Sequence, residues 1–113
     1  MTISAASGGA VSNVAPGDVS TLLAAVAQAD AEAQRVLAGR LVARVRRAAH
    51  AFMPRSIDAD DAALHALIEL LRSAHTYRGE GSLERWADPV LSRSIVRFAR
   101  AVRRRNGEGS GED

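Results

Sequence analysis

A row of arginines near the C-terminal end of the chain has the spacing to hold a polyanion. Four arginines recur at steps of three and four residues, which places them on one side of a helix. They are Arg93, Arg97, Arg100 and Arg104. No acidic residue lies between Pro89 and Asn106 to neutralise them. The row is either a solvated basic face or a phosphate-binding surface, and the repulsion between like charges at this spacing favours the second.

The segment YRGEGSLERW, from Tyr77 to Trp86, brings aromatic and charged side chains next to a turn. Gly79 and Gly81 permit positive φ, so the segment could be no more than a tight connection between helices. Ser82 can cap the helix that follows. Trp86 lies four residues beyond this cap, where an aromatic residue is more often part of a core than a base-stacking platform.

Asp61, His65 and Glu69 recur at four-residue steps and could in principle hold a metal, with His50 or His75 as a further ligand. A solvated polar stripe with local charge pairs explains the same pattern, and we favour it. No nucleophile, base and orienting acid cluster in the sequence, and no phosphate-binding loop follows a strand. We therefore expect neither catalysis nor a bound metal or cofactor.

Composition limits the class of protein. The chain has 113 residues, a formal net charge of +2 and no cysteine, which indicates a single domain and is compatible with a reducing compartment. Its N-terminus lacks a basic region followed by a long apolar run, so we expect no signal peptide and no membrane insertion. The expected location is the cytoplasm.

The elements that must position these side chains are helical. Residues 1–17 are small, polar and Gly-rich and are expected to form a disordered arm, and residues 106–113 a flexible acidic linker or tail. Between them the apolar residues follow a helical period, and no alternating run favours a strand. We therefore predict an all-α fold, a compact bundle of about four helices over residues 18–105, with disordered tails at both ends.

The first helix is expected to begin near Asp18 or Ser20, both good N-caps, and to end near Gln28. Asp30 is a second cap, from which a long helix is expected to reach about Phe52, before Pro54. The predicted apolar faces are Leu22, Leu23 and Val26 in the first helix and Leu37, Leu41, Val45, Ala48 and Phe52 in the second. A third helix is expected over residues 58–75, with acidic residues in its first turn. Its predicted buried stripe is Leu64, Leu67, Ile68 and Leu71.

Pro89 decides the form of the last helix. Inside a continuous helix it would lose one hydrogen bond and collide with the carbonyl of Arg85, at a cost of about 3 kcal/mol. Asp88 as a new N-cap, with Pro89 as the first helical residue, avoids this cost. We therefore expect a break at 87–88 and a helix from there to about Arg105. Its predicted buried side is Leu91, Ile95, Phe98 and Val102.

Taken together, these motifs resemble region 2 of bacterial sigma-70-type factors, and most closely the small extracytoplasmic-function group. In that group an acidic D-x-(E/D)-D start is followed at a fixed distance by (F/Y)-R-G-E-G-S-(F/L), two or three residues and a tryptophan. Here the acidic start is Asp58-Ala59-Asp60-Asp61, and Tyr77 to Trp86 follows without a gap. An arginine-rich helix lies downstream. The resemblance covers about residues 20–105.

The resemblance implies a DNA site and a polymerase site. In sigma region 2 the loop and the following helix line the place where a base of the −10 promoter element, on the single-stranded non-template strand, is flipped out of the stack. A flipped base needs a stacking face and edge-reading groups, which these residue types supply. The implied DNA-binding residues are Arg78, Glu80, Ser82, Trp86, Arg93, Arg97, Arg100 and Arg104. The acidic helix corresponds to the surface that grips a coiled coil of core RNA polymerase, with Asp58, Asp60, Asp61, His65 and Glu69 as the implied contacts.

Two segments depart from the family pattern. Leu64 and His65 stand where the family has a Gln-Glu pair on the polymerase-binding side, and Val90 to Arg93 (VLSR) stands where Ile-Ala-Arg-Asn is usual. The expected function is therefore that of a sigma factor region 2 domain in transcription initiation, with two alternatives kept open. One is a sigma-like interaction module that binds an anti-sigma factor without promoter activity, and the other is a non-specific helical binder of nucleic acid. Full-length factors of this group also carry a helix-turn-helix domain for the −35 element, and the linker-like tail favours a fragment of such a factor.

Overall fold

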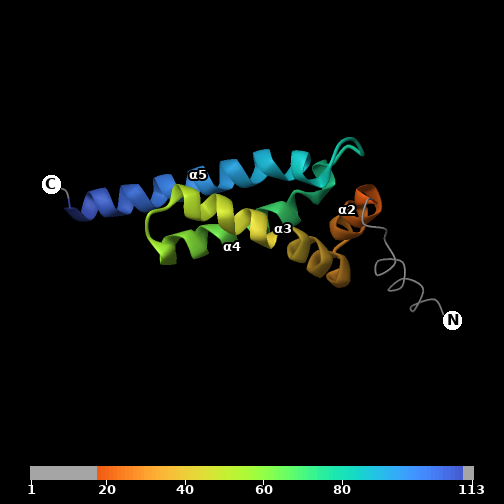
Figure 1. The fold of residues 1–113 in the computed structure, drawn as a ribbon, viewed down its shortest axis with the longest axis horizontal. Helices are drawn as coiled ribbons and strands as arrows, with labels where there is room; N and C mark the ends of the chain where they lie inside the picture. The colour runs from red at the N-terminus through yellow and green to blue at the C-terminus, as the bar shows by residue number, and fades with distance from the viewer. Residues whose placement is uncertain (1–17, 111–113) are drawn as a thin grey trace.

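The structure is a computed structural model, which describes residues 18–110, with side chains described through residue 107. Every regular element in this part of the chain is helical, which confirms the predicted all-α fold. The elements are α2 (Val19–Ala27), α3 (Ala31–Phe52), α4 (Ser56–Arg72), a 3-10 helix η1 (Ala74–Thr76) and α5 (Leu83–Ser110). In Figure 1, α3, α4 and α5 lie alongside one another and α2 packs at one end of the bundle. The expected disordered arm, residues 1–17, lies outside the described residues.

Side-chain caps define the starts of the first two helices, as the sequence predicts. Asp18 accepts a hydrogen bond from the Thr21 amide (3.2 Å), and Asp30 accepts one from the Ala33 amide (2.9 Å). Each cap satisfies a backbone N–H that has no partner inside its helix. The boundaries of α2 and α3 therefore follow from two local signals.

Burial on α3 differs from the prediction at its C-terminal end. Leu37, Leu41 and Val45 are buried as predicted, but Phe52 is 57% exposed and Ala48 is only half-buried. The buried residues instead follow steps of four along the helix, through Ala33, Leu37, Leu41, Val45, Ala49 and Met53. Such a row winds slowly around a helix, so α3 keeps contact with α2, α4 and α5 in turn.

The buried face of α4 was predicted wrongly. Leu64 is 60% exposed and Ile68 is 41% exposed, while Leu67 and Leu71 are only partly buried. The buried residues are Ala59, Ala62, Ala63, Ala66 and Leu70. Because α4 packs against both α3 and α5, small alanines on the inner face let the backbones approach closely. Leu64 and Ile68 consequently lie on the outer face. The helix begins at Ser56 and ends at Arg72, and the rest of the expected 58–75 helix becomes η1.

The predicted break at 87–88 is also wrong, because α5 is one helix with Pro89 inside it. Figure 1 shows α5 running along the bundle as a single ribbon. Leu83 and Ala87 before the proline and Leu91 after it are all buried, so one continuous apolar face holds both halves on the bundle. This packing outweighs the local preference of Pro89 for a helix start.

The predicted buried side of α5 is confirmed at Leu91, Ile95 and Val102, and Phe98 packs partly against the core. The C-terminal end differs from the prediction, because the helix continues to Ser110 instead of ending near Arg105. Adding residues to an existing helix costs far less than starting one. The expected flexible linker over 106–113 is thus helical through residue 110, and residues 111–113 lie outside the described part.

Candidate nucleic-acid interface

The connection between η1 and α5 is shaped by two glycines and a cap. Gly79 and Gly81 have φ values of 86° and 81°, in the left-handed region that side chains other than glycine rarely adopt. Ser82 accepts a hydrogen bond from the Arg85 amide (3.1 Å) and begins α5. The glycine turn and the cap are both as the sequence predicts. They fold the loop back toward the first turns of α5.

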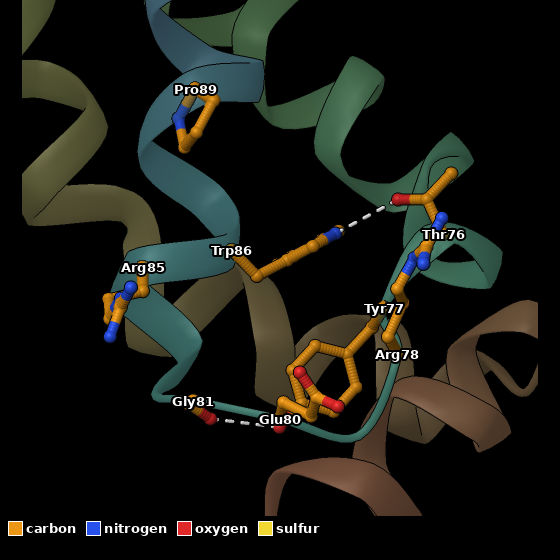
Figure 2. Close-up of a pocket in the computed structure, with 8 residues that line it drawn as sticks. All are labelled: Thr76, Tyr77, Arg78, Glu80, Gly81, Arg85, Trp86 and Pro89. Atoms are coloured by element: carbon orange, nitrogen blue, oxygen red, sulfur yellow. Dashed lines mark hydrogen bonds between the residues drawn. The ribbon is translucent and has the colours of Figure 1, made fainter.

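Two aromatic side chains are fixed across this loop by their own hydrogen bonds. The Tyr77 hydroxyl donates to the Gly81 carbonyl (2.9 Å), and the Trp86 indole N–H donates to the Thr76 hydroxyl (3.0 Å). The two ring centroids are 6.4 Å apart with the planes nearly perpendicular, at 85°. Trp86 also packs against the core, so it is both a partner of the core and a wall of the loop site. Figure 2 shows both hydrogen bonds and the rings between them.

These side chains line an open pocket of about 400 Å³. The lining residues are Thr76, Tyr77, Arg78, Glu80, Gly81, Arg85, Trp86 and Pro89 (Figure 2). Of the residues that the resemblance assigns to DNA binding, Arg78, Glu80 and Trp86 are in the pocket, whereas Ser82 caps α5 instead. The sequence did not single out Arg85 or Thr76, although both flank the glycine turn. The pocket combines aromatic walls with three charged side chains.

The arginine row continues along α5 from this pocket. At about 100° per residue, Pro89 and the four arginines of the row lie within an arc of about 80°. With a rise of about 1.5 Å per residue, the row extends about 22 Å from Pro89 to Arg104. All four arginines are exposed, as predicted, and Arg97 has a loose ion pair with Glu69 of α4 (3.8 Å). The row therefore begins at the pocket and runs down one side of the helix.

A long-range ion pair holds the first part of α5 against α3. Arg44 donates two hydrogen bonds to the Asp88 carboxylate, from Nε at 2.7 Å and from Nη2 at 2.8 Å. The hydrogen bonds from Arg44 lower the pKa of Asp88 below its ordinary value, and the same contact raises the pKa of Arg44, while burial opposes both shifts. Asp88 is thus engaged in tertiary packing two residues after Trp86, and it is not the N-cap that the sequence predicted.

Four of the five residues assigned to polymerase binding lie on one side of α4 at steps of three and four residues, and Asp60 lies on another side. Asp60 faces α3, where it contacts His50 (3.1 Å), and Glu69 faces α5 through its contact with Arg97. His65 stacks at a tilt on Phe98 of α5, with ring centroids 5.2 Å apart. Asp58 lies near Arg55 (3.8 Å), and Asp61 is exposed on the outer side. Asp58, Asp61, His65 and Glu69 therefore share one side of α4, and among the five only Asp60 lies toward α3.

Sequence reasoning missed the apolar centre of the outer α4 face. Ile57 is 63% exposed, and it lies in line with Asp61, Leu64 and Ile68 at steps of three and four residues. The sequence signal that could have revealed this exposed face is the row of alanines on the opposite, inner face of α4. An apolar stripe of this kind, flanked by acidic residues, is typical of a protein-binding surface.

The described residues contain neither a metal-binding group nor a membrane-spanning helix. Among residues 18–107 no group of three acidic, histidine or cysteine side chains is arranged to hold a metal ion, so Asp61, His65 and Glu69 do not form a cluster. Among the described helices, none is both long enough and apolar enough to cross a membrane.

Comparison with known proteins identifies the family. The family model of sigma-70 region 2 matches residues 37–105, which include the pocket, the arginine row and α4. A search of curated proteins and a search of solved structures each found no match. Region 2 is the part of a sigma factor that binds RNA polymerase and recognises promoter DNA during transcription initiation, and it is not a catalytic family. Because the match spans more than half of the chain, this protein belongs to the sigma-70 region 2 family.

Proposed function

We propose that this chain is the region 2 domain of a sigma factor of the extracytoplasmic-function type, which docks on core RNA polymerase through α4 and captures one unstacked base of the −10 element in the loop pocket. The observation that carries the proposal is the position of the pocket at the head of the arginine row. When a base is held between the aromatic walls, the rest of its strand lies on the same side of α5 as the exposed guanidinium groups. Phosphate contacts then position the strand, while the pocket reads the base.

The charge of α5 supports binding of a single strand next to the pocket. If four to six arginines contact phosphates of a single strand, log Kd should change with log salt concentration with a slope of about 3 to 4. Base stacking on aromatic side chains contributes about 1–3 kcal/mol per base. The phosphate contacts are independent of the base sequence, and base stacking is confined to the pocket. A sequence preference must therefore come from the loop.

Fluorescence of Trp86 provides the test of base capture, since it is the only tryptophan in the chain and lines the pocket. Single-stranded oligonucleotides with −10-like and scrambled sequences are titrated at several salt concentrations. We expect tighter binding and stronger quenching with the −10-like strand. Equal binding and equal quenching by both strands would reject base capture and leave non-specific nucleic-acid binding.

The outer face of α4 supports docking on a protein. Leu64 replaces the polar residue of the family at an exposed position, so the surface gains apolar area while Asp61 keeps a negative charge beside it. We expect the domain to co-elute with core RNA polymerase, and Asp61→Lys to weaken that complex because an acidic patch steers a basic partner. Glu32→Lys, the same charge reversal on a half-buried residue in the first turn of α3, is the control and should not weaken it.

The altered α4 surface also favours one second candidate function. A sigma-like module that binds an anti-sigma factor needs the outer α4 face but not the polymerase. Failure to co-elute with core RNA polymerase at low salt, together with intact folding, would favour this module over the sigma factor.

A further inference from the structure

The polar atoms of the two aromatic walls are already used inside the protein. The Trp86 N–H donates to the Thr76 hydroxyl, which itself donates to the Ser73 carbonyl (2.6 Å). The Tyr77 hydroxyl donates to the Gly81 carbonyl. Breaking any of these bonds to contact a ligand would leave another group without a partner. The rings are therefore fixed as stacking walls and have no donor left to read a base edge.

Three charged side chains of the pocket remain free to read an edge. Within the described part of the chain, Arg78, Glu80 and Arg85 make no side-chain hydrogen bond or ion pair. Two of them are guanidinium groups, which donate only and therefore cannot accept a hydrogen bond from a base. Glu80 is the one acceptor side chain among the three, because an ionised carboxylate accepts hydrogen bonds and donates none. Recognition of hydrogen-bond donors on a base edge in this pocket therefore falls on Glu80.

A carboxylate distinguishes bases by their amino groups. Cytosine, adenine and guanine each carry an exocyclic amine that can donate to it, as in the pairing of acidic side chains with the amine of cytosine. Thymine has no amine, and its one edge donor, N3–H, lies between two carbonyl oxygens that would repel the carboxylate. We infer that the pocket selects an unstacked base that carries an exocyclic amine and disfavours thymine, with Glu80 as the specificity-determining residue. This inference rests on the proposed function.

Amine-deleted bases test the inference without changing the shape of the strand. In a −10-like oligonucleotide, 2-pyrimidinone replaces cytosine and purine replaces adenine, one position at a time, and Trp86 quenching reports binding. At the captured position, we expect loss of the amine to weaken binding by the wild-type chain about tenfold, which corresponds to about 1.4 kcal/mol. Glu80→Ala should bind the amine-bearing and amine-deleted strands equally.

Glu84→Ala is the matched control, since it removes a nearby acid that does not line the pocket. It should keep the full penalty for loss of the amine. Thermal melting of each variant shows that the fold is intact, and Glu80 is exposed in the loop, so little change is expected. A penalty that persists in Glu80→Ala, or tightest binding with thymine at the captured position, would overturn the inference while leaving base capture intact. Binding that is independent of the base at every position would overturn the inference and the proposed function together.

Discussion

Replacing Pro89 with alanine is expected to stabilise the protein. Pro89 lies inside α5, which begins at Leu83, so it has no N–H to donate to the Arg85 carbonyl. A proline inside a helix destabilises the folded state by about 3 kcal/mol relative to alanine. Alanine also makes the unfolded chain more flexible, which lowers the free energy of unfolding by about 0.4–1 kcal/mol. Because a helix can relax locally around a proline, we expect Pro89→Ala to recover about 1–2 kcal/mol. In a domain of this size this corresponds to a rise in melting temperature of about 5–15 °C.

Circular dichroism at 222 nm gives the melting temperatures, and Pro54→Ala is the control. Pro54 is exposed in the turn between α3 and α4, outside any helix. Its replacement should only increase the entropy of the unfolded chain and lower the melting temperature by a few degrees. The opposite signs of the two changes separate a helix-interior proline from a turn proline.

A fall in melting temperature for Pro89→Ala would refute the continuous helix. In that case Asp88 and Pro89 would begin a separate helix, as local sequence preferences suggest, and alanine would remove a favourable N-terminal residue. The bond between Asp88 and Arg44 argues against this outcome, because a capping aspartate must direct its carboxylate to its own helix. The melting experiment thus decides between tertiary packing and local capping.

The remaining predictions use the same domain. Leu70→Ala should lower the free energy of unfolding by about 2–5 kcal/mol, whereas Leu64→Ala should change it by less than about 0.5 kcal/mol, because only Leu70 is buried; denaturant titrations compare them. The pKa of Asp88 is lowered in the folded state, so its contribution to stability is present above the unfolded pKa and is lost as pH falls through the folded pKa. The melting-temperature difference between wild type and Asp88→Asn should therefore shrink below about pH 4, and a difference that stays constant would contradict this. Replacing Arg97 and Arg100 together with alanine should weaken binding of all single strands and reduce the salt slope by about 1.4, and a loss confined to one sequence would argue against phosphate contacts.

Much of the fold could be predicted because its signals are local. The caps at Asp18 and Asp30 and the cap at Ser82 act within three residues, and Gly79 and Gly81 meet a local demand for positive φ. The buried and exposed sides of the second half of α5 follow from periodicity, since large apolar residues and arginines there occupy opposite sides of the helix. In each case neighbours in sequence supply the physical cause.

The errors arose where packing across the bundle outweighed local preference. On α4, periodicity alone offers two apolar faces, one of large residues and one of alanines, and only the closeness of α3 and α5 selects the alanines. At Pro89, the buried residues Leu83 and Leu91 require one helical face across the proline. The pocket could be foreseen as a loop motif, but the internal hydrogen bond of Trp86 could not, because Thr76 becomes its partner only after η1 forms.

The arrangement of α4 and α5 bears on how the proposed functions coexist. The outer α4 stripe, with Leu64 and Asp61, is on the far side of that helix from its contacts with the bundle, whereas the arginine row is on α5. Glu69, which is not part of the outer stripe, is the α4 residue that approaches Arg97 of the row (3.8 Å). A partner on the outer α4 stripe therefore need not cover the arginines or the pocket. Since this stripe and the pocket draw on different residues, polymerase docking and base capture can occur on one domain at the same time.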